Sequence, residues 1–565
     1  MEGASYTYQL TKDRHLRLYM DTLISYIAGA QLPDGYLYTA WNLRAKDYSD
    51  AYCLYEKDRY DNLKDSHELY NAGHMYEAAV AHYQATGQTN FLDIATKNAD
   101  HIYDLFGPGK REAVPGHQEI EIGLVKLYRV TRNPKYLEMA KLFLDRRGKG
   151  LGAGAPYSQD HKPVTEQEEA VGHAVRANYM YTAMTDIAAL TGDQEYVRAI
   201  DKLWENVVNK KMYLTGGMGA LYHGEAYGKN YELPNISYAE TCASIAGVYW
   251  NHRMFLLHGD AKYIDVMERI MYNGLISGVS LDGTKFFYPN VLYADGKLDF
   301  NQGKPGRSEW FTCSCCPTNI VRFVSSVPGY LYATCGDQIY VNLYMDNTVN
   351  IELKKTDIRI EQQTDYPWNG TVRTIISPSR KTRFTVNFRI PGWTQGSPVP
   401  GDLYTYTNNT PAKPVITING VQADVAVEKG YAKIDREWKK GDIVELEFLM
   451  EVKKVVANEN VEADNGRIAL EYGPLVYCLE EPDNGPVDHI LLDKNANFKA
   501  HFQSDILGGV TVLEGDATII TLNENKVSGM SRPVKAIPYY AWNHRGDKSM
   551  VVWIPYRMQG VSIHP

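Results

Sequence analysis

Four segments decide the fold of the first half of this chain: ATGQTNFLDIA (85–95), VTRNPKYLEMA (130–140), LTGDQEYVRAI (190–200) and LHGDAKYIDVM (257–267). In each segment a helical stretch ends at a glycine or at Asn-Pro, and an aromatic residue opens the next amphipathic stretch. Glycine ends helices because it accepts left-handed backbone, and proline fits the first position of a new helix. Repetition at intervals of tens of residues predicts stacked helical hairpins, in an open solenoid or a closed ring.

Three histidines stand in similar places in this helical region. His74, His117 and His173 each follow a glycine and precede an amphipathic stretch. If the helices form a ring, equivalent helix starts meet at one mouth, so the three imidazoles would converge on a central pocket. The alternative is that each histidine satisfies backbone groups at its own helix start.

The pattern changes to strands from about Gln338. Alternating apolar and polar residues between glycine and proline turns predict a first β module, most simply a sandwich. A second β region follows the polar stretch NENVEADNG (458–466). We therefore expect a helical domain at 1–335 and two β-sandwich domains at 336–457 and 458–565.

Composition narrows the classes of function. The chain has 565 residues, of which 44% are apolar, and a net charge of −9, which argues against a nucleic-acid partner. We see no apolar run of about 18 residues, so we expect no membrane insertion. The 43 tyrosines and nine tryptophans suit carbohydrate surfaces, although each ring also suits ordinary packing. The first residues, MEGASYTYQL, read as the middle of a helical region, so we expect the chain to begin inside a longer protein.

A split cysteine cluster carries the strongest chemical signal. Glu240 and Cys242 form an E-T-C element, and C-S-C-C follows at 313–316. Zinc takes four ligands from thiolates, imidazoles and carboxylates, so Glu240 with three of these four cysteines would complete a set. Adjacent cysteines and a carboxylate are unusual in structural zinc sites. One thiolate could therefore be a labile ligand that leaves the metal and acts as a nucleophile. The alternative is a group of buried, reduced thiols.

A cysteine nucleophile in a glycosidase needs a general acid and base. Glu225, in H-G-E-A-Y-G just before the E-T-C element, is the candidate. The alternative is a solvated carboxylate in a glycine-rich loop.

At this point the sequence resembles the β-L-arabinofuranosidase glycoside hydrolases, family 127 and its relatives. The matching segments are HELYNAGHMYEAAVA (67–81), PGHQEIEIGLVKLY (115–128), QDHKPVTEQEEAVGHAVRANYMY (159–181), GEAYGKNYELPNISYAETCASIAGVYWNHRM (224–254), ERIMYNGLISG (268–278), WFTCSCCPTNIVRF (310–323), FRIPGW (388–393) and RIALEYGPLVYCLE (467–480). The resemblance implies an (α/α)6-barrel catalytic domain, lacking its N-terminal segment here, and two β-sandwich domains.

The same resemblance implies roles for single residues. It implies one Zn²⁺ held by Glu240, Cys242, Cys315 and Cys316. It implies Cys315 as the nucleophile of a retaining reaction that releases L-arabinofuranose, and Glu225 as the general acid and base. It also implies that His74, His117, His173 and Tyr288 contact the sugar. The role of Cys313 is open.

Three other functions are kept as alternatives. A relative of the same family could act on another plant pectin sugar, such as aceric acid. Sugar epimerases also build helical rings with histidines at the mouth. A non-catalytic carbohydrate-binding protein with a structural zinc is the third alternative. The expected partner is an oligosaccharide or plant glycan, and we allow for a homodimer.

Overall fold

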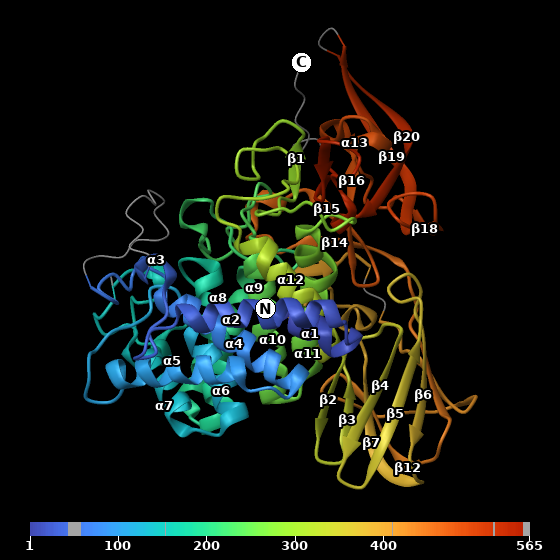
Figure 1. The fold of residues 1–565 in the computed structure, drawn as a ribbon. Helices are drawn as coiled ribbons and strands as arrows, with labels where there is room; N and C mark the ends of the chain where they lie inside the picture. Colours follow the sequence, from blue (N-terminus) through green and yellow to red (C-terminus); the bar gives the residue numbers. More distant parts are fainter. Residues whose placement is uncertain (43–57, 153, 409–410, 524–525, 558–565) are drawn as a thin grey trace. The chain divides into compact units, whose positions relative to one another are not determined.

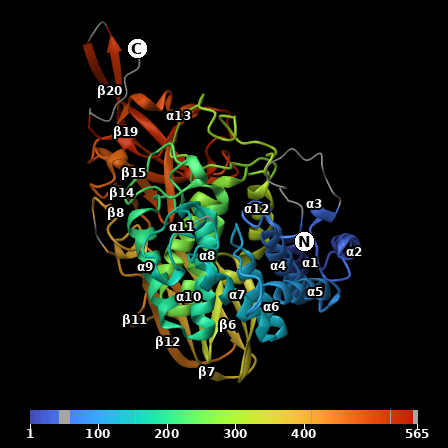
Figure 2. The same cartoon turned by 90° about the vertical axis from the view of Figure 1, so that its left-hand side faces the viewer.

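The computed structural model describes residues 1–42, 58–152, 154–408, 411–523 and 526–557. The chain forms two compact units. Figures 1 and 2 draw the fold in two views, with colours that follow the sequence. The first unit contains residues 1–207, 221–227 and 318–327, and the second contains residues 208–220, 228–317 and 328–565. Among the described residues, no helix is both long and apolar enough to cross a membrane.

Helices dominate the first 330 residues, as expected. They are α1 (Glu2–Thr11), α2 (Arg14–Ala30), α3 (Thr39–Asn42), α4 (Glu68–Thr86), α5 (Asn90–Phe106), α6 (Ile120–Thr131), α7 (Pro134–Arg146), α8 (Ala174–Thr191), α9 (Gln194–Lys210), α10 (Thr241–His258), α11 (Ala261–Ile270) and α12 (Cys315–Ser326).

The four repeated segments form the turns of four helical hairpins, which confirms that prediction. They join α4 to α5, α6 to α7, α8 to α9 and α10 to α11. Gly87, Gly192 and Gly259 end their helices in the left-handed conformation, with φ between 65° and 72°, and Arg132 takes the same conformation without being glycine. The aromatic residue after each turn is buried: these are Phe91, Tyr136, Tyr196 and Tyr263.

Helices α4 and α6 of the first unit approach each other so closely that their contact needs glycine. A Cβ atom added to Gly73 would lie 2.7 Å from backbone atoms of Glu119 and Ile120. A Cβ atom added to Gly123 would lie 2.5 Å from the carbonyl oxygen of Gly73. Neither position leaves room for a side chain, so backbone packs against backbone here. Because His74 follows Gly73 in α4, this contact brings it next to Glu119.

The first β module consists of two sheets in the second unit. Its strands are β2 (Tyr332–Cys335), β3 (Gln338–Val341), β4 (Asn347–Leu353), β5 (Thr356–Gln363), β6 (Thr371–Pro378), β7 (Thr382–Arg389), β9 (Val415–Ile418), β10 (Val421–Gln422), β11 (Val427–Glu428), β12 (Tyr431–Trp438) and β13 (Asp442–Glu447). One sheet has the order β10-β9-β13-β6-β5-β4 and the other β11-β12-β7-β3-β2. Buried residues of both sheets form one core, as in a sandwich.

The second β module is one branched sheet of eleven strands, where two separate sheets were expected. The strands are β1 (Tyr293–Asp295), β8 (Tyr404–Tyr406), β14 (Val452–Ala457), β15 (Arg467–Tyr472), β16 (Leu475–Glu480), β17 (Ile490–Leu491), β18 (Phe498–Gln503), β19 (Val510–Asn523), β20 (Lys526–Pro538), β21 (Ser549–Val551) and β22 (Ile554–Pro555). The short helix α13 (Glu481–Asn484) follows β16. Strands β1 and β8 come from far earlier in the chain, and they pair with β21 and β14.

Strand pairing also shows where the modules change. β2 pairs with β3, and β14 pairs with β15. The changes therefore fall a few residues before the expected positions 336 and 458.

Within the second unit, α11 is tied to both β modules by buried ion pairs. The Arg389 guanidinium, from β7, contacts Asp265 at 2.6 Å and Glu268 at 2.5 Å. Arg269 contacts Glu471, from β15, at 2.6 Å. Buried charges are stable only when they are paired, so these contacts fix the position of α11 on the two modules.

The contact between α4 and α6 leads to a first prediction. Replacing Gly73 by alanine forces the two backbones apart, and we expect this to cost about 1–3 kcal/mol of stability. Gly29→Ala is the matched control, because Gly29 lies in α2 with no atom within 4 Å of the added Cβ. Alanine is the better helix former, so the control should gain about 0.5–1 kcal/mol. Thermal unfolding measures both, and equal melting temperatures for the two variants would contradict this account.

Candidate active site

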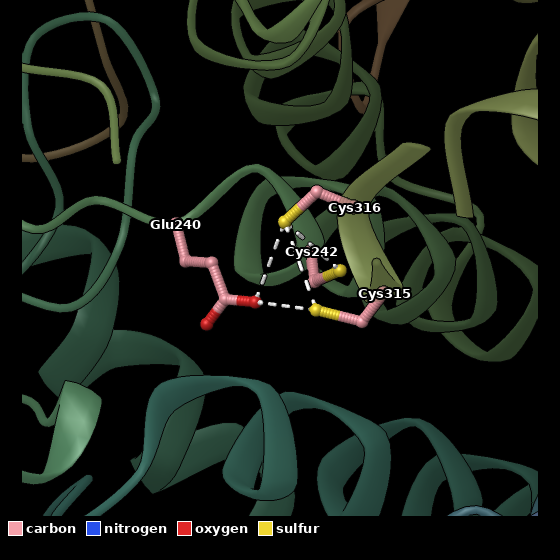
Figure 3. A group of neighbouring side chains, drawn as sticks. All are labelled: Glu240, Cys242, Cys315 and Cys316. Atoms are coloured by element: carbon pink, nitrogen blue, oxygen red, sulfur yellow. Dashed lines mark hydrogen bonds between the residues drawn. The ribbon is translucent and has the colours of Figure 1, made fainter. Parts of the chain in front are cut away.

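Glu240, Cys242, Cys315 and Cys316 come together in the second unit. Glu240 precedes α10 and Cys242 lies in its first turn, while the adjacent cysteines open α12. The Sγ atoms of Cys242 and Cys316 lie 3.5 Å apart, and those of Cys315 and Cys316 lie 3.9 Å apart. Oε1 of Glu240 lies 3.6 Å from both Cys315 and Cys316 (Figure 3).

These separations match the edges of a tetrahedral zinc site. Zinc binds sulfur at about 2.3 Å and oxygen at about 2.1 Å, which gives edges of about 3.8 Å between sulfurs and about 3.6 Å between sulfur and oxygen. All four ligand atoms lie within 4.8 Å of one another. The sulfur separations are also much longer than a disulfide bond of about 2.05 Å. The donor set therefore fits a single metal ion.

Electrostatics favours a cation at this point. Burial, together with the neighbouring sulfurs of Cys242 and Cys315, raises the pKa of the Cys316 thiol well above its usual value. Glu240 is also buried. Three thiolates and a carboxylate this close repel one another, so ionising them together needs a positive charge between them.

Tyr288 lies against the cysteine cluster. Its hydroxyl is 3.1 Å from the Sγ atom of Cys315 and 4.0 Å from that of Cys313. A hydrogen bond with Cys315 raises the pKa of the Cys313 thiol, and burial adds to this effect. Tyr288 was expected to contact a sugar, and the structure shows in addition that its hydroxyl accepts a hydrogen bond from the Cys315 thiol.

The three histidines gather in the first unit, together with Tyr70 of α4 and His67, which immediately precedes that helix. The ring centres of His117 and His173 lie 5.7 Å apart. The Tyr70 ring lies 4.4 Å from His117 and 4.5 Å from His74, and His67 lies 5.9 Å from His117.

Only one of the three histidines opens a helix, which corrects the sequence-based prediction. His173 caps α8, and its Nδ1 accepts a hydrogen bond from the backbone N–H of Arg176. His117 lies three residues before α6. His74 lies inside α4, which begins at Glu68. The glycine before His74 serves the close contact with α6 rather than a helix start.

Burial keeps these imidazoles neutral. It lowers the pKa of His74 to about 3, helped by the Arg322 guanidinium. It also lowers the pKa of His117 and of His173, and the Arg176 guanidinium adds to both effects. Neutral imidazoles serve as hydrogen-bond donors or acceptors for sugar hydroxyls at neutral pH.

His173 holds Glu225. Because Nδ1 of His173 accepts the bond from the helix backbone, its Nε2 carries the proton and faces Oε2 of Glu225 at 2.8 Å. Gly224 and Glu225 take the left-handed conformation, with φ of 70° and 51°. Hydrogen bonds from Tyr227 to Gly172 and Asn178 fix the same loop on the start of α8. The Glu225 side chain is 30% exposed, so it is held and still accessible.

Four residues of this cluster were missed by sequence reasoning, and His67 is one of them. Tyr70 lies one helical turn before His74, and Arg176 lies one turn after His173, so helical spacing could have indicated both. Arg176 is buried, with its guanidinium 4.8 Å from the centre of the Tyr157 ring. Glu119 lies at the apolar start of α6 and is fully buried. Acidic side chains are seldom fully buried, so a glutamate among apolar residues at a helix start could have indicated a functional group.

Comparison with protein families gives matches along nearly the whole chain. Residues 1–329 match the catalytic domain of β-L-arabinofuranosidase, glycoside hydrolase family 127. Residues 338–450 match the middle domain of that family, and residues 452–555 match its C-terminal domain.

Individual proteins with similar sequences or structures agree with these matches. The chain is 34% identical to the non-reducing end β-L-arabinofuranosidase of Bifidobacterium longum subsp. longum, over 98% of this chain and 87% of that protein. A solved family 127 β-arabinofuranosidase is 50% identical, with a TM-score of 0.95, over 100% of this chain and 88% of that one. A family 127 β-L-arabinofuranosidase from Geobacillus stearothermophilus T6 is 41% identical, with a TM-score of 0.90, over 98% and 89%.

Proposed function

Because this chain belongs to glycoside hydrolase family 127, we propose that it releases L-arabinofuranose from β-L-arabinofuranosides by a retaining mechanism with a cysteine nucleophile. The chain is a glycoside hydrolase, and its relatives of known name are β-L-arabinofuranosidases. The observation that carries the proposal is the convergence of Glu240, Cys242, Cys315 and Cys316. The four helical hairpins further support the proposal that the first 335 residues close into an (α/α)6 barrel.

Glu240, Cys242, Cys315 and Cys316 are the residues that would hold Zn²⁺ in this proposal. Zinc would keep the sulfurs ionised and make a thiolate a better leaving group. Tyr288 adds a hydroxyl 3.1 Å from the Cys315 sulfur, and its hydrogen bond would orient that atom and stabilise its charge.

The first step would form a covalent intermediate on Cys315. Its Sγ attacks the anomeric carbon, a C–S bond forms, and the bond to the leaving oxygen breaks. Glu225 gives its proton to that oxygen, so the aglycone departs as a neutral alcohol. His173 donates a hydrogen bond to Glu225, which would hold the carboxyl group in position for this transfer.

The second step would release the sugar with its original configuration. Glu225, now ionised, takes a proton from water, whose oxygen attacks the anomeric carbon as the C–S bond breaks. The electron pair of that bond returns to Cys315, and the Glu225 proton is restored. His74 and His117 would form hydrogen bonds with ring hydroxyls in both steps. These hydrogen bonds would become stronger as positive charge develops on the sugar, and would thus stabilise the transition state.

Removing the metal gives the next prediction. We expect one zinc per chain by elemental analysis of the purified protein, and loss of both zinc and activity on treatment with a chelator. Cys242→Ser should lower the zinc content, because it removes one of four ligands. Cys335→Ser is the control, since Cys335 is exposed on β2. Wild-type protein that is active without any bound metal would refute the metal part of the proposal.

The roles of Cys315 and Glu225 give a separate prediction. With p-nitrophenyl β-L-arabinofuranoside, Cys315→Ser should lose at least about 10³-fold in kcat, because the hydroxyl is a far weaker nucleophile. Glu225→Gln should lose about 10²–10⁴-fold on glycans with poor leaving groups. With the nitrophenyl substrate, it should accumulate protein carrying one anhydro-pentose on Cys315, seen by mass spectrometry.

Glu232→Gln is the control for Glu225→Gln, because it changes a nearby loop carboxylate that accepts a bond from the Lys229 backbone. Full activity of Cys315→Ser would exclude this nucleophile. An inactive wild type with zinc bound would instead indicate another sugar, such as aceric acid, and a wild type inactive on every glycoside would favour a carbohydrate-binding protein.

A further inference from the structure

An exposed tyrosine lies beside the Glu225 loop in the first unit, and the proposed mechanism gives it no role. Tyr157 belongs to the short 3-10 helix Pro156–Ser158 and is 42% exposed. Exposed aromatic rings are common on protein surfaces. What distinguishes this ring is that the structure holds it in a fixed position at the candidate site.

Buried groups hold the backbone around Tyr157. Its carbonyl oxygen accepts a hydrogen bond from the backbone N–H of His173 at 3.0 Å. The carbonyl oxygen of the next residue, Ser158, accepts hydrogen bonds from Arg147 at 2.8 Å and from Gln118 at 3.0 Å. Both of these side chains are fully buried. The short helix is therefore fixed against His173, at the start of α8.

The aromatic ring of Tyr157 is held as well. The Arg176 guanidinium lies over it, 4.8 Å from the ring centre, and donates a hydrogen bond to the carbonyl oxygen of Gly116. The His173 ring packs edge-on, with 5.6 Å between the ring centres. A Cβ atom added to Gly224 would lie 3.5 Å from Cδ2 of Tyr157. Because these contacts already order the ring, placing a ligand against its exposed part costs little conformational entropy.

The Tyr157 ring lies one imidazole away from the carboxyl group of Glu225. Oε2 of Glu225 is 2.8 Å from Nε2 of His173, whose ring contacts that of Tyr157. Gly224, which contacts the same tyrosine ring, is the residue before Glu225. In the proposed mechanism, Glu225 protonates the oxygen that joins the arabinofuranose to the rest of the glycan. The first sugar of the leaving group is bonded to that oxygen, so it lies within reach of the tyrosine.

We propose that Tyr157 binds the leaving group, with its exposed ring stacked against the first sugar of the aglycone. The inference deepens the proposed function and rests on it for the side of Glu225 on which the aglycone lies. Tyrosine suits this contact because its ring has an apolar face and a polar tip, which match the C–H groups and the hydroxyls of a sugar. Tyr157 takes no part in bond formation or proton transfer, so it determines which aglycones are accepted.

A purely structural role for Tyr157 has a different consequence. If the ring only supported His173 and Arg176, its removal would disturb the Glu225 site and slow every substrate to the same degree. Loss of an aglycone contact slows only those substrates that carry a ring in the leaving group, because only they use that contact in the transition state.

Three glycosides separate these two cases: methyl β-L-arabinofuranoside, cyclohexyl β-L-arabinofuranoside, and a disaccharide in which L-arabinofuranose is β-linked to a second pentose. All three leaving groups are alcohols, so all three need protonation by Glu225. We expect Tyr157→Ala to lower kcat/KM about tenfold on the two ring-bearing substrates and to keep it within about twofold on the methyl glycoside, because only the apolar ring contact is lost. Release of L-arabinose measures all three reactions.

Two further variants serve as controls for this experiment. Tyr157→Phe keeps the ring, so its kcat/KM on the ring-bearing substrates should stay within about threefold of the wild type. Tyr26→Ala removes a tyrosine of α2 that is 70% exposed, and it should leave all three values unchanged.

The ratio of kcat/KM between the cyclohexyl and methyl glycosides decides the inference. If Tyr157→Ala leaves this ratio as it is in the wild type, Tyr157 does not bind the aglycone, and the proposed function stands because the wild type still releases arabinose. A wild type that releases arabinose from none of the three glycosides would refute the proposed function and this inference together.

Discussion

A charge that is buried must be balanced within a few ångströms, and this constraint organises the chain at three places. Cys242, Cys315, Cys316 and Glu240 bring four potential negative charges within 4.8 Å of one another. Near His74, Lys126 and Arg322 form ion pairs with Glu2 and Glu77. On α11, Arg269 meets Glu471 and the helix carboxylates meet Arg389. The solutions differ: the cysteine cluster is a metal-type donor set, whereas the other two places use ion pairing.

Much of the helical architecture could be predicted because its signals are local. A glycine or Asn-Pro turn followed by an aromatic residue is enough to locate a hairpin, since the turn needs left-handed backbone and the ring needs burial. Arg132 shows the limit, because it adopts that backbone conformation without the glycine that normally reveals it. The cysteine set was also evident, because few other uses explain three cysteines within four residues.

What could not be predicted depends on partners that are distant in the sequence. β1 pairs with β21 across more than 250 residues, and no local pattern reports such a pairing. Gly73 has the sequence appearance of a helix start, but its function is a backbone contact with α6 that only the fold reveals. In the same way, the hydroxyl of Tyr288 and the carboxyl group of Glu119 are visible in the sequence, while the atoms they face are not.

The contact of α4 with α6 also bears on how the substrate range of such an enzyme can change. Next to His74, the two helices touch through main-chain atoms at Gly73 and Gly123. A backbone contact of this kind cannot be loosened by shortening side chains at Gly73 and Gly123, because glycine has none. Evolution or engineering toward a larger or branched sugar would have to work on other segments, such as the glycine-rich loop around Glu225. The contact between α4 and α6 would then stay unchanged while other segments alter the specificity.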